Sequence, residues 1–205
     1  MGRPPTWTEA ELLGAVMAVF RRKGFGHTSL LDIQEATGLH PGSIYKAYGS
    51  KDGIFLAALN AYNERVVARR VATYLDSADR PLSGIRALFA STFESGEAKN
   101  PGCLLTTTAV EACLLDPSAR AAVSEGLNIL EGGFQRALSR AQEGGDIPSS
   151  ARVDDLAAQM LALYQGVLVL VRFGASPRKL TVITNLAMRS LEQPITPKKK
   201  KGKRR

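Results

Sequence analysis

The side chains best suited to bind another molecule lie together in one short stretch, residues 41–48. If this stretch is a helix, Ile44 and Tyr48 lie four residues apart and point inward together. The outward face then carries hydroxyl groups and one cation, and it has no carboxylate. Groups of this kind bind the base edges and the phosphates of double-stranded DNA. That face would comprise Gly42, Ser43, Tyr45 and Lys46.

Two short helices joined by a glycine turn are predicted to position this stretch. Thr28 and Ser29 are candidate caps for a helix that ends at Thr37, and Gly38 breaks that helix. Pro41 then occupies the first turn of the next helix. A short helix, a glycine turn and a second short helix form the layout of a helix-turn-helix motif. Its small core would comprise Leu30, Ile33, Leu39, Ile44 and Tyr48.

The rest of the chain is also predicted to be helical. Thr8 and Glu11 fit a capping box, which predicts a first helix over residues 9–23. Ser50 can cap a fourth helix, whose apolar stripe continues to about Leu75. No strand alternation and no internal repeat are present, so the fold class is all-α. Later helices should be separated at Pro81 and at residues 100–102, 116–117, 144–145 and 174–177.

The positive charge of the chain is concentrated at its C-terminus. The 205 residues carry a formal net charge of +8, and seven of the basic residues lie in positions 198–205. Residues 1–197 are therefore close to neutral. A hydrophobic content of 44% is ample for a buried core, which excludes disorder of the whole chain. The basic tail, residues 194–205, is expected to be disordered.

Several other classes of protein find no support in the sequence. Two cysteines and two histidines are too scattered for a metal site, and no cofactor is expected. The first residues do not resemble a signal peptide, and the apolar run at 160–171 is shorter than the roughly 20 residues of a membrane span. We therefore expect a cytoplasmic protein. No nucleophile elbow or phosphate loop is present, so an enzyme is not expected, and a helical enzyme stays only as an alternative.

The N-terminal sequence resembles the TetR-type bacterial transcriptional regulators. The resemblance rests on residues 2–4, on residues 20–25 and above all on residues 38–59, which look like the recognition helix of the family and its junction to the fourth helix. It implies about nine helices and a homodimer formed through the last two helices. Two recognition helices would then enter successive major grooves of a palindromic operator, about 34–36 Å apart.

The resemblance also implies roles for individual residues. Ser43 and Lys46 would contact base edges, and Gly42 would admit close approach. Tyr45, Thr28, Ser29 and Lys51 would bind phosphates. His40 could reach the DNA backbone. Tyr48 is also a candidate DNA-binding residue, although it stands where the family more commonly has phenylalanine. Gln34 stands where the family usually has alanine, at the close approach of the two motif helices.

The remainder would form the effector domain of a repressor that a small apolar ligand releases from DNA. The expected organisation is a DNA-binding domain at 1–50, a ligand-binding and dimerisation domain at 51–193, and the tail at 194–205. The fourth helix would transmit the ligand's effect. Candidate cavity residues are Phe89, Phe93, Cys103, Thr107, Val110, Phe134, Leu161, Tyr164 and Leu168.

Two other regulatory hypotheses remain open from the sequence. Cys103 follows Asn100-Pro101-Gly102 at a predicted helix start, where a thiol can become reactive, so a redox or electrophile sensor is one alternative. The other is a nonspecific DNA-compacting protein that acts through the lysine-rich tail.

Overall fold

Helices account for all the regular structure in residues 8–94 and 102–192, which are the parts of the chain that the computed structural model describes. The all-α prediction is confirmed for these residues. Two π-helical segments, Asn63–Ala68 and Val71–Asp76, continue the fourth helix, and a short 3₁₀ turn spans Ala112–Leu114. The α-helices are α1 (Glu9–Lys23), α2 (Leu30–Thr37), α3 (Pro41–Tyr48), α4 (Lys51–Tyr62), α5 (Pro81–Ala90), α6 (Leu104–Ala109), α7 (Pro117–Glu143), α8 (Val153–Phe173) and α9 (Pro177–Glu192).

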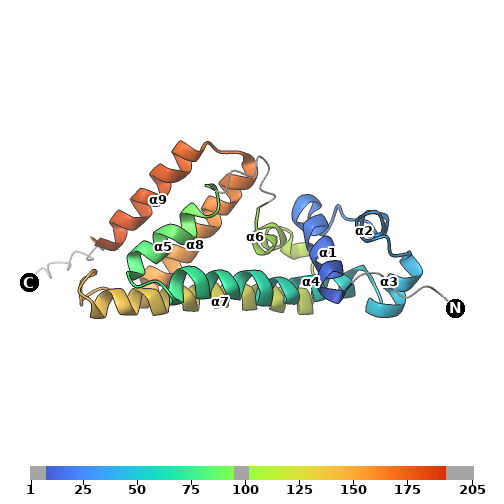
Figure 1. Cartoon of the computed structure of the whole chain (residues 1–205), viewed down its shortest axis with the longest axis horizontal. Coiled ribbons are helices and arrows are strands. Elements are labelled where there is room, and N and C mark those ends of the chain that lie inside the picture. The colour runs from blue at the N-terminus through green and yellow to red at the C-terminus, as the bar shows by residue number, and fades with distance from the viewer. Residues whose placement is uncertain (1–7, 95–101, 193–205) are drawn as a thin grey trace, which may run out of the picture.

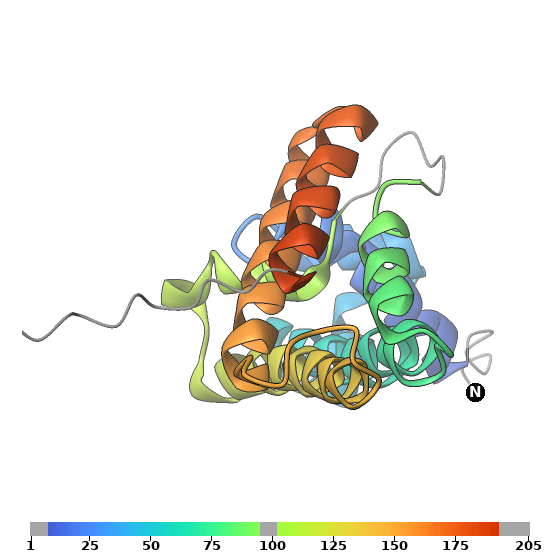
Figure 2. The same cartoon turned by 90° about the vertical axis from the view of Figure 1, so that its left-hand side faces the viewer.

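The helices are distributed along one long axis (Figure 1). α2 and α3 lie at one end of this axis, α9 lies at the other, and α7 runs along it. α7 packs against both α4 and α8, and α8 packs against α9. The view along the axis shows α8 and α9 side by side, rising from the layer that contains α7 (Figure 2). α2 and α3 therefore lie at the opposite end of the molecule from α9, whereas the end of α8 reaches the end of α1.

Local capping interactions fix the ends of the N-terminal helices. Thr8 and Glu11 form the predicted capping box, and Ser29 caps α2. Gly38 ends α2 in the left-handed region at φ +69°, which a residue with a side chain rarely adopts. Ser50 accepts a hydrogen bond at the start of α4. Because each cap contributes about 1 kcal/mol, these residues set the boundaries that the sequence predicted.

The fourth helix and its π-helical segments, residues 51–76, form one long helix that we call the α4 arm. It continues through its π-helical segments to Asp76, as far as the sequence predicted. Gly133 of α7 packs against this arm so closely that an added Cβ would lie 2.7 Å from Val71. The small residue therefore lets α7 and the arm approach, and the arm contributes to both halves of the molecule.

One continuous core contains two aromatic groups. At the α2–α3 end, Phe55 lies 4.6 Å from Phe20 and 4.7 Å from Phe25 between ring centroids. At the other end, Tyr164 lies 5.2 Å from Phe89 and 6.2 Å from Phe134. All these rings belong to the same cluster of buried residues, so the hydrophobic core of the described residues is continuous from one end to the other.

Two helices differ from what their sequence pattern predicted. α6 is only six residues long, and Cys113 lies beyond it in the exposed 3₁₀ turn. Cys103 and Cys113 therefore do not share one helix. α8 spans 21 residues and is the one helix of the described chain that is long and apolar enough to cross a membrane. One side of α8 packs in the core, and the other side is exposed in the monomer.

Candidate nucleic-acid interface and ligand cavity

The outer face of α3 is open to solvent, and its inner face anchors the helix. Ile44 is completely buried, whereas Gly42, Ser43, Tyr45 and Lys46 are all exposed. Tyr45 keeps 53% of its surface accessible. The predicted division of this helix into a core face and a face with hydroxyl and ammonium groups is confirmed.

His40 has a local role that the sequence left open. It is the N-cap of α3, and its Nδ1 accepts a hydrogen bond of 3.2 Å from the backbone N–H of Gly42. With Nδ1 as acceptor, the neutral imidazole carries its proton on Nε2, which leaves that atom as a donor. His40 therefore orients the first turn of α3, and its contact with the DNA backbone stays a prediction.

Two of the residues expected to bind phosphates have structural roles in this fold. Thr28 is only 3% exposed, and its hydroxyl donates to the carbonyl of Gly24 at 2.6 Å. Lys51 Nζ donates to the carbonyls of Phe25 and Thr28 at 3.0 and 3.1 Å, and it lies 4.2 Å from the Phe25 ring centroid. These contacts fix the α1–α2 loop to the start of α4. The expected phosphate contact of the Thr28 side chain is thus corrected, because its hydroxyl is buried and already bonded. Lys51 is only partly buried and keeps a third N–H donor, so its phosphate contact remains a prediction.

Ser29 is exposed at the start of α2 but shares that position with an acid. Its hydroxyl and backbone N–H donate to Asp32 at 3.0 and 2.8 Å. Asp32 also pairs with Lys23 at 2.5 Å. The Lys23 ammonium, together with the Ser29 hydrogen bonds, holds the pKa of Asp32 at about 2, so this carboxylate is ionised at neutral pH. A phosphate contact by Ser29 remains a prediction.

Tyr48 and Gln34 lie at the rear of the motif. Tyr48 is half-buried and packs against the core, and burial raises the pKa of its hydroxyl, with a smaller contribution from Glu9. Gln34 is also half-buried on α2. Tyr48 therefore supports α3 from within the predicted core of the motif.

Two side chains of opposite charge connect the effector domain to the end of α1 and to the α1–α2 turn. Glu111 accepts hydrogen bonds from the backbone N–H groups of Phe25 at 2.6 Å and Gly26 at 3.3 Å. Arg172, at the end of α8, donates to the backbone carbonyls of Arg21 and Arg22 at the end of α1. The turn between α1 and α2 is therefore bonded on one side to an acid and on the other to an arginine from distant parts of the chain.

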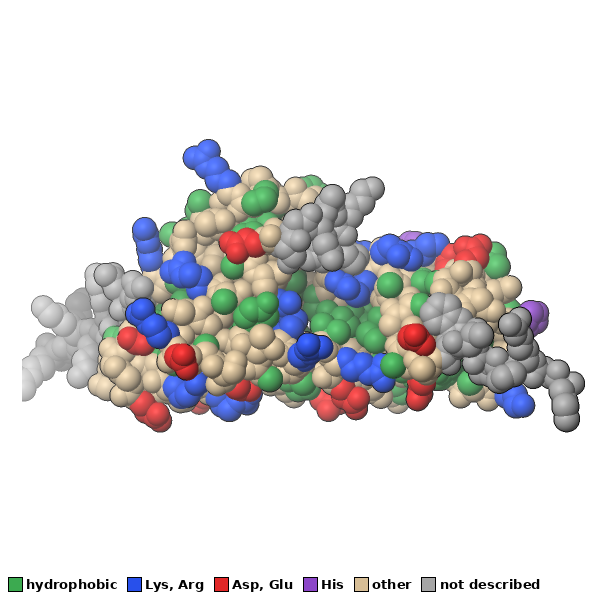
Figure 3. All heavy atoms as spheres, viewed as in Figure 1, with side chains coloured by type: hydrophobic (Ala, Val, Ile, Leu, Met, Phe, Trp, Pro, Cys, Tyr) green, Lys and Arg blue, Asp and Glu red, His purple; other side chains and the backbone are tan. Residues whose placement is uncertain are grey.

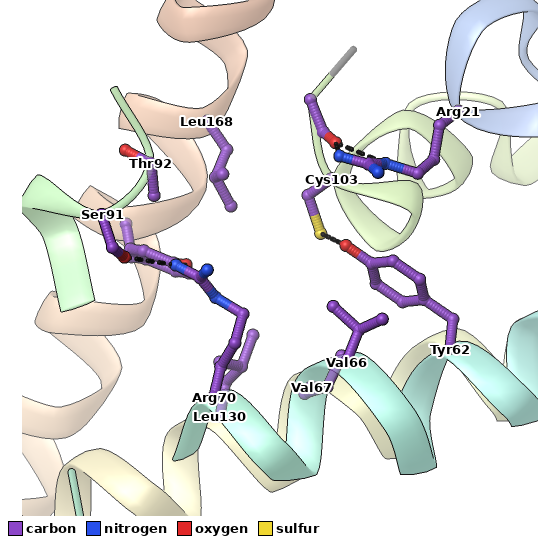
Figure 4. A pocket seen from close by; sticks show the side chains of 12 residues that line it. Arg21, Tyr62, Val66, Val67, Arg70, Ser91, Thr92, Cys103, Leu130 and Leu168 are labelled. Atoms are coloured by element: carbon purple, nitrogen blue, oxygen red, sulfur yellow. Dashed lines mark hydrogen bonds between the residues drawn. The ribbon is translucent and has the colours of Figure 1, made fainter. Parts of the chain in front are cut away.

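A cavity of about 90 Å³ lies between the α4 arm and helices α5, α7 and α8 (Figure 4). The space-filling view shows hydrophobic side chains gathered in a hollow near the middle of the molecule, with Lys and Arg side chains beside it (Figure 3). Of the predicted cavity residues, Cys103, Tyr164 and Leu168 line it. The other lining residues were not predicted from the sequence: they are Arg21, Tyr62, Val66, Val67, Arg70, Ser91, Thr92, Gly102 and Leu130.

The other predicted cavity residues lie elsewhere. Phe89 and Phe134 are fully buried and pack against Tyr164 behind the cavity wall. Phe93 and Leu161 are half-buried and are not part of the lining. Thr107 and Val110 line a second space of about 260 Å³ at the junction with the α1–α2 turn. The four residues Phe89, Phe93, Phe134 and Leu161 line neither of the two spaces, because helical periodicity identifies core positions without showing where a core is incomplete. Ligand binding by Thr107 and Val110 remains a prediction.

The cavity is more polar than the sequence predicted. Arg70 follows Tyr62 and Val66 on the stripe of α4 at intervals of four residues, so an arginine on a buried stripe was the available signal. Its Nη2 lies 2.6 Å from Ser91 Oγ and 3.1 Å from Tyr164 Oη. Burial raises the pKa of Tyr164 to about 12 despite the opposing effect of Arg70, so its hydroxyl is neutral.

Cys103 is buried at the N-cap of α6, between the two spaces. The Tyr62 hydroxyl lies 3.5 Å from its Sγ. Among the described residues, no group of three His, Cys, Asp or Glu side chains could hold a metal ion.

The fold and the open face of α3 define a helix-turn-helix DNA-binding protein with an appended helical domain. A family model described as "Bacterial regulatory proteins, tetR family" matches residues 12–58, and one described as "Tetracyclin repressor-like, C-terminal domain" matches residues 81–186. The chain belongs to this family of transcriptional regulators. Such regulators are dimers that bind small-molecule effectors, and they are normally not enzymes.

Individual relatives agree with this assignment. The chain is 28% identical to the HTH-type transcriptional repressor ComR of Escherichia coli over 191 residues, which cover 92% of this chain and 90% of the relative. It is 27% identical to the repressor DhaR of a Mycobacterium species over 154 residues, 74% of this chain and 75% of the relative. A cysteine mutant of the regulator CifR, complexed with 26-bp double-strand operator DNA, superposes with a TM-score of 0.79 at 25% identity, covering 92% of this chain and 99% of that one.

Proposed function

We propose that this regulator is a homodimeric repressor that binds a palindromic operator through α3 and leaves it when a small molecule occupies the cavity beside Arg70. The observation that carries the proposal is the exposed, carboxylate-free face of α3, in a domain whose α1–α2 turn is bonded to the effector domain. Relatives named as transcriptional repressors support the direction of regulation.

In this proposal α3 enters the major groove with its outer face toward the bases. Ser43 and Lys46 contact base edges, and lysine favours guanine O6 and N7. Gly42 admits close approach, Tyr45 donates to a phosphate, and Ser29 binds another phosphate beside the start of α2. Lys51 and Thr28 support this geometry indirectly by fixing the α1–α2 loop.

The dimer would form through the exposed faces of α8 and α9. On α8 one exposed stripe is small or apolar, and the exposed Asp154, Asp155, Gln159 and Arg172 lie near its two ends or beside it. On α9, Val182 and Leu186 are exposed. Four helices pack closely when their contact faces are of this type. Covering them would also bury Phe173, which is 87% exposed in the monomer. The α8 face comprises Ala158, Ala162, Gly166, Val169 and Phe173.

Release from DNA would follow from the contacts between the two domains. The cavity is bounded by the α4 arm and by α8, and Arg172 at the end of α8 holds the end of α1. A ligand that moves α8 relative to α4 therefore changes the orientation of α1 and of the motif attached to it. The two α3 helices of the dimer then no longer fit successive major grooves.

Selection of binding sites from random DNA tests the proposal. The wild-type protein should enrich a palindrome whose half-sites are about one helical turn apart. Lys46→Ala should weaken operator binding by about 1–3 kcal/mol and relax the preference at one base pair. Arg69→Gln is the matched control, since Arg69 is an exposed cation on the α4 arm, outside the motif. Failure to enrich any palindrome, or equal loss of affinity in the two variants, contradicts the proposal.

Two further parts of the sequence reading remain proposals. We retain the domain limits at 1–50, 51–193 and 194–205, and the tail lies outside the described residues. A tail that adds only nonspecific affinity should, when removed, flatten the salt dependence by up to about 0.9 per phosphate contact and leave the sequence preference intact. Loss of all preference would favour nonspecific DNA compaction instead.

A further inference from the structure

The central cavity contains a cation that no described acid neutralises. Nη2 of Arg70 donates to Ser91 Oγ, to Tyr164 Oη and, at 3.4 Å, to the carbonyl of Leu88. All three acceptors are neutral. None of the ion pairs formed by the described residues includes Arg70. Because arginine stays protonated in proteins, this part of the cavity wall is positively charged.

The guanidinium also has donors left for a ligand. Its bonds to described residues all use Nη2, and Nε and Nη1 have no acceptor there. Figure 4 shows Arg70 reaching from the arm toward Ser91, across the cavity from the Tyr62–Cys103 pair. Nε and Nη1 face different sides of the guanidinium, so each can donate a separate charge-assisted hydrogen bond to a small anion.

The remaining lining separates into a polar and an apolar part. Among the described residues no aspartate or glutamate lines the cavity, and a second arginine, Arg21, lines it and donates to the carbonyl of Gly102. The apolar lining comprises Val66, Val67, Leu130 and Leu168. A ligand that matches this wall has one anionic group and a short hydrocarbon part.

The volume limits the length of that hydrocarbon part. The cavity measures about 90 Å³. A dry protein cavity of about 150 Å³ is known to hold benzene. The preformed space therefore fits a molecule smaller than a benzene ring.

We propose that the effector is a short-chain monocarboxylate, which accepts a charge-assisted hydrogen bond from Arg70 and lays its alkyl chain against Val66, Leu130 and Leu168. This inference rests on the proposed function, because it names the chemistry of the ligand in the same cavity. It also gives the ligand a means to act on the fold. Arg70 already joins the α4 arm to Ser91 at the end of α5 and to Tyr164 of α8, and a bound carboxylate would act on this existing junction through the same guanidinium.

Calorimetric titration of the full-length protein with matched acids and amides tests the inference. The probes are acetate and propionate, their neutral amides, inorganic phosphate and sulfate. Wild-type protein should bind at least one acid and prefer it over its amide by roughly 10- to 100-fold, the range expected for hydrogen bonds to a charged group. Arg70→Gln should remove this preference, whereas Arg69→Gln should keep it. Arg70→Lys keeps the charge without the planar fork and should bind with intermediate affinity.

Each other outcome overturns the inference. Equal binding of an acid and its amide, binding of none of the acids, or equally tight binding of phosphate or sulfate is incompatible with a carboxylate site. The acid and amide comparison uses only the wild type, so it stands even if Arg70→Gln does not fold. Operator binding is measured on the same samples. Specific operator binding without acid binding refutes the inference alone, and absence of specific operator binding refutes the proposed function.

Discussion

The DNA-reading end and the effector end of this molecule satisfy their polar groups in different ways. The capping bonds of α2 and α3 link neighbours in sequence: Ser29 bonds Asp32 three residues away, and His40 bonds Gly42 two residues away. Around the cavity, Arg70 bonds Tyr164 across 94 residues. At the junction between the two ends, Arg172 bonds Arg22 across 150 residues.

This difference separates a reading element from a responding one. Local caps keep the geometry of α3 constant whatever the rest of the chain does, and a reading helix must keep that geometry to match base edges. Bonds between distant helices change when those helices move, so they can carry the effect of a ligand. The effector end can therefore switch because its polar contacts are not local.

Truncation of one ring at each end should produce the largest effect on stability. Phe55→Ala and Phe134→Ala each remove a fully buried ring and should lower the free energy of unfolding by about 3–5 kcal/mol. Because one continuous core joins the ends, both variants should still unfold in a single transition in chemical denaturation followed by circular dichroism. Two separate transitions would show that the ends are independent domains and would invalidate the comparison.

Glu111→Gln should affect regulation more than DNA binding. The charge-assisted bonds to Phe25 and Gly26 hold the α1–α2 turn against the effector domain, and the amide is a weaker acceptor. Fluorescence anisotropy with labelled operator should show wild-type-like affinity without effector. The effector-induced loss of affinity should shrink by about 3- to 30-fold, in the range of common coupling energies. Glu125→Gln on α7 is the control, since Glu125 is exposed. Unchanged release in Glu111→Gln would remove this contact from the mechanism.

The same contrast explains how far the sequence could be read. The capping box at Thr8, the glycine turn at Gly38 and the inward position of Ile44 follow from residues a few positions apart, so helix boundaries and the outer face of α3 were predicted correctly. The loop contacts of Lys51 were not predicted because its carbonyl partners, Phe25 and Thr28, lie more than twenty positions away. Arg70 was missed for the same reason. A cavity depends on where packed helices leave space, and periodicity within one helix does not contain that information.

The smallest expected effect is on the acid sensitivity of the melting temperature, and it should arise at the DNA-reading end. The pKa of Asp32 is held at about 2 in the folded protein by Lys23 and Ser29, below its ordinary value of 3.8. A depressed folded pKa stabilises the protein above the unfolded pKa, and this stabilisation is lost as the pH falls from about 4 toward 2. Asp32→Asn should therefore reduce the decrease in melting temperature over that interval, and Glu35→Gln on the exposed side of the same helix should not. An identical acid profile for Asp32→Asn and wild type would mean that this local bond network does not stabilise the start of α2.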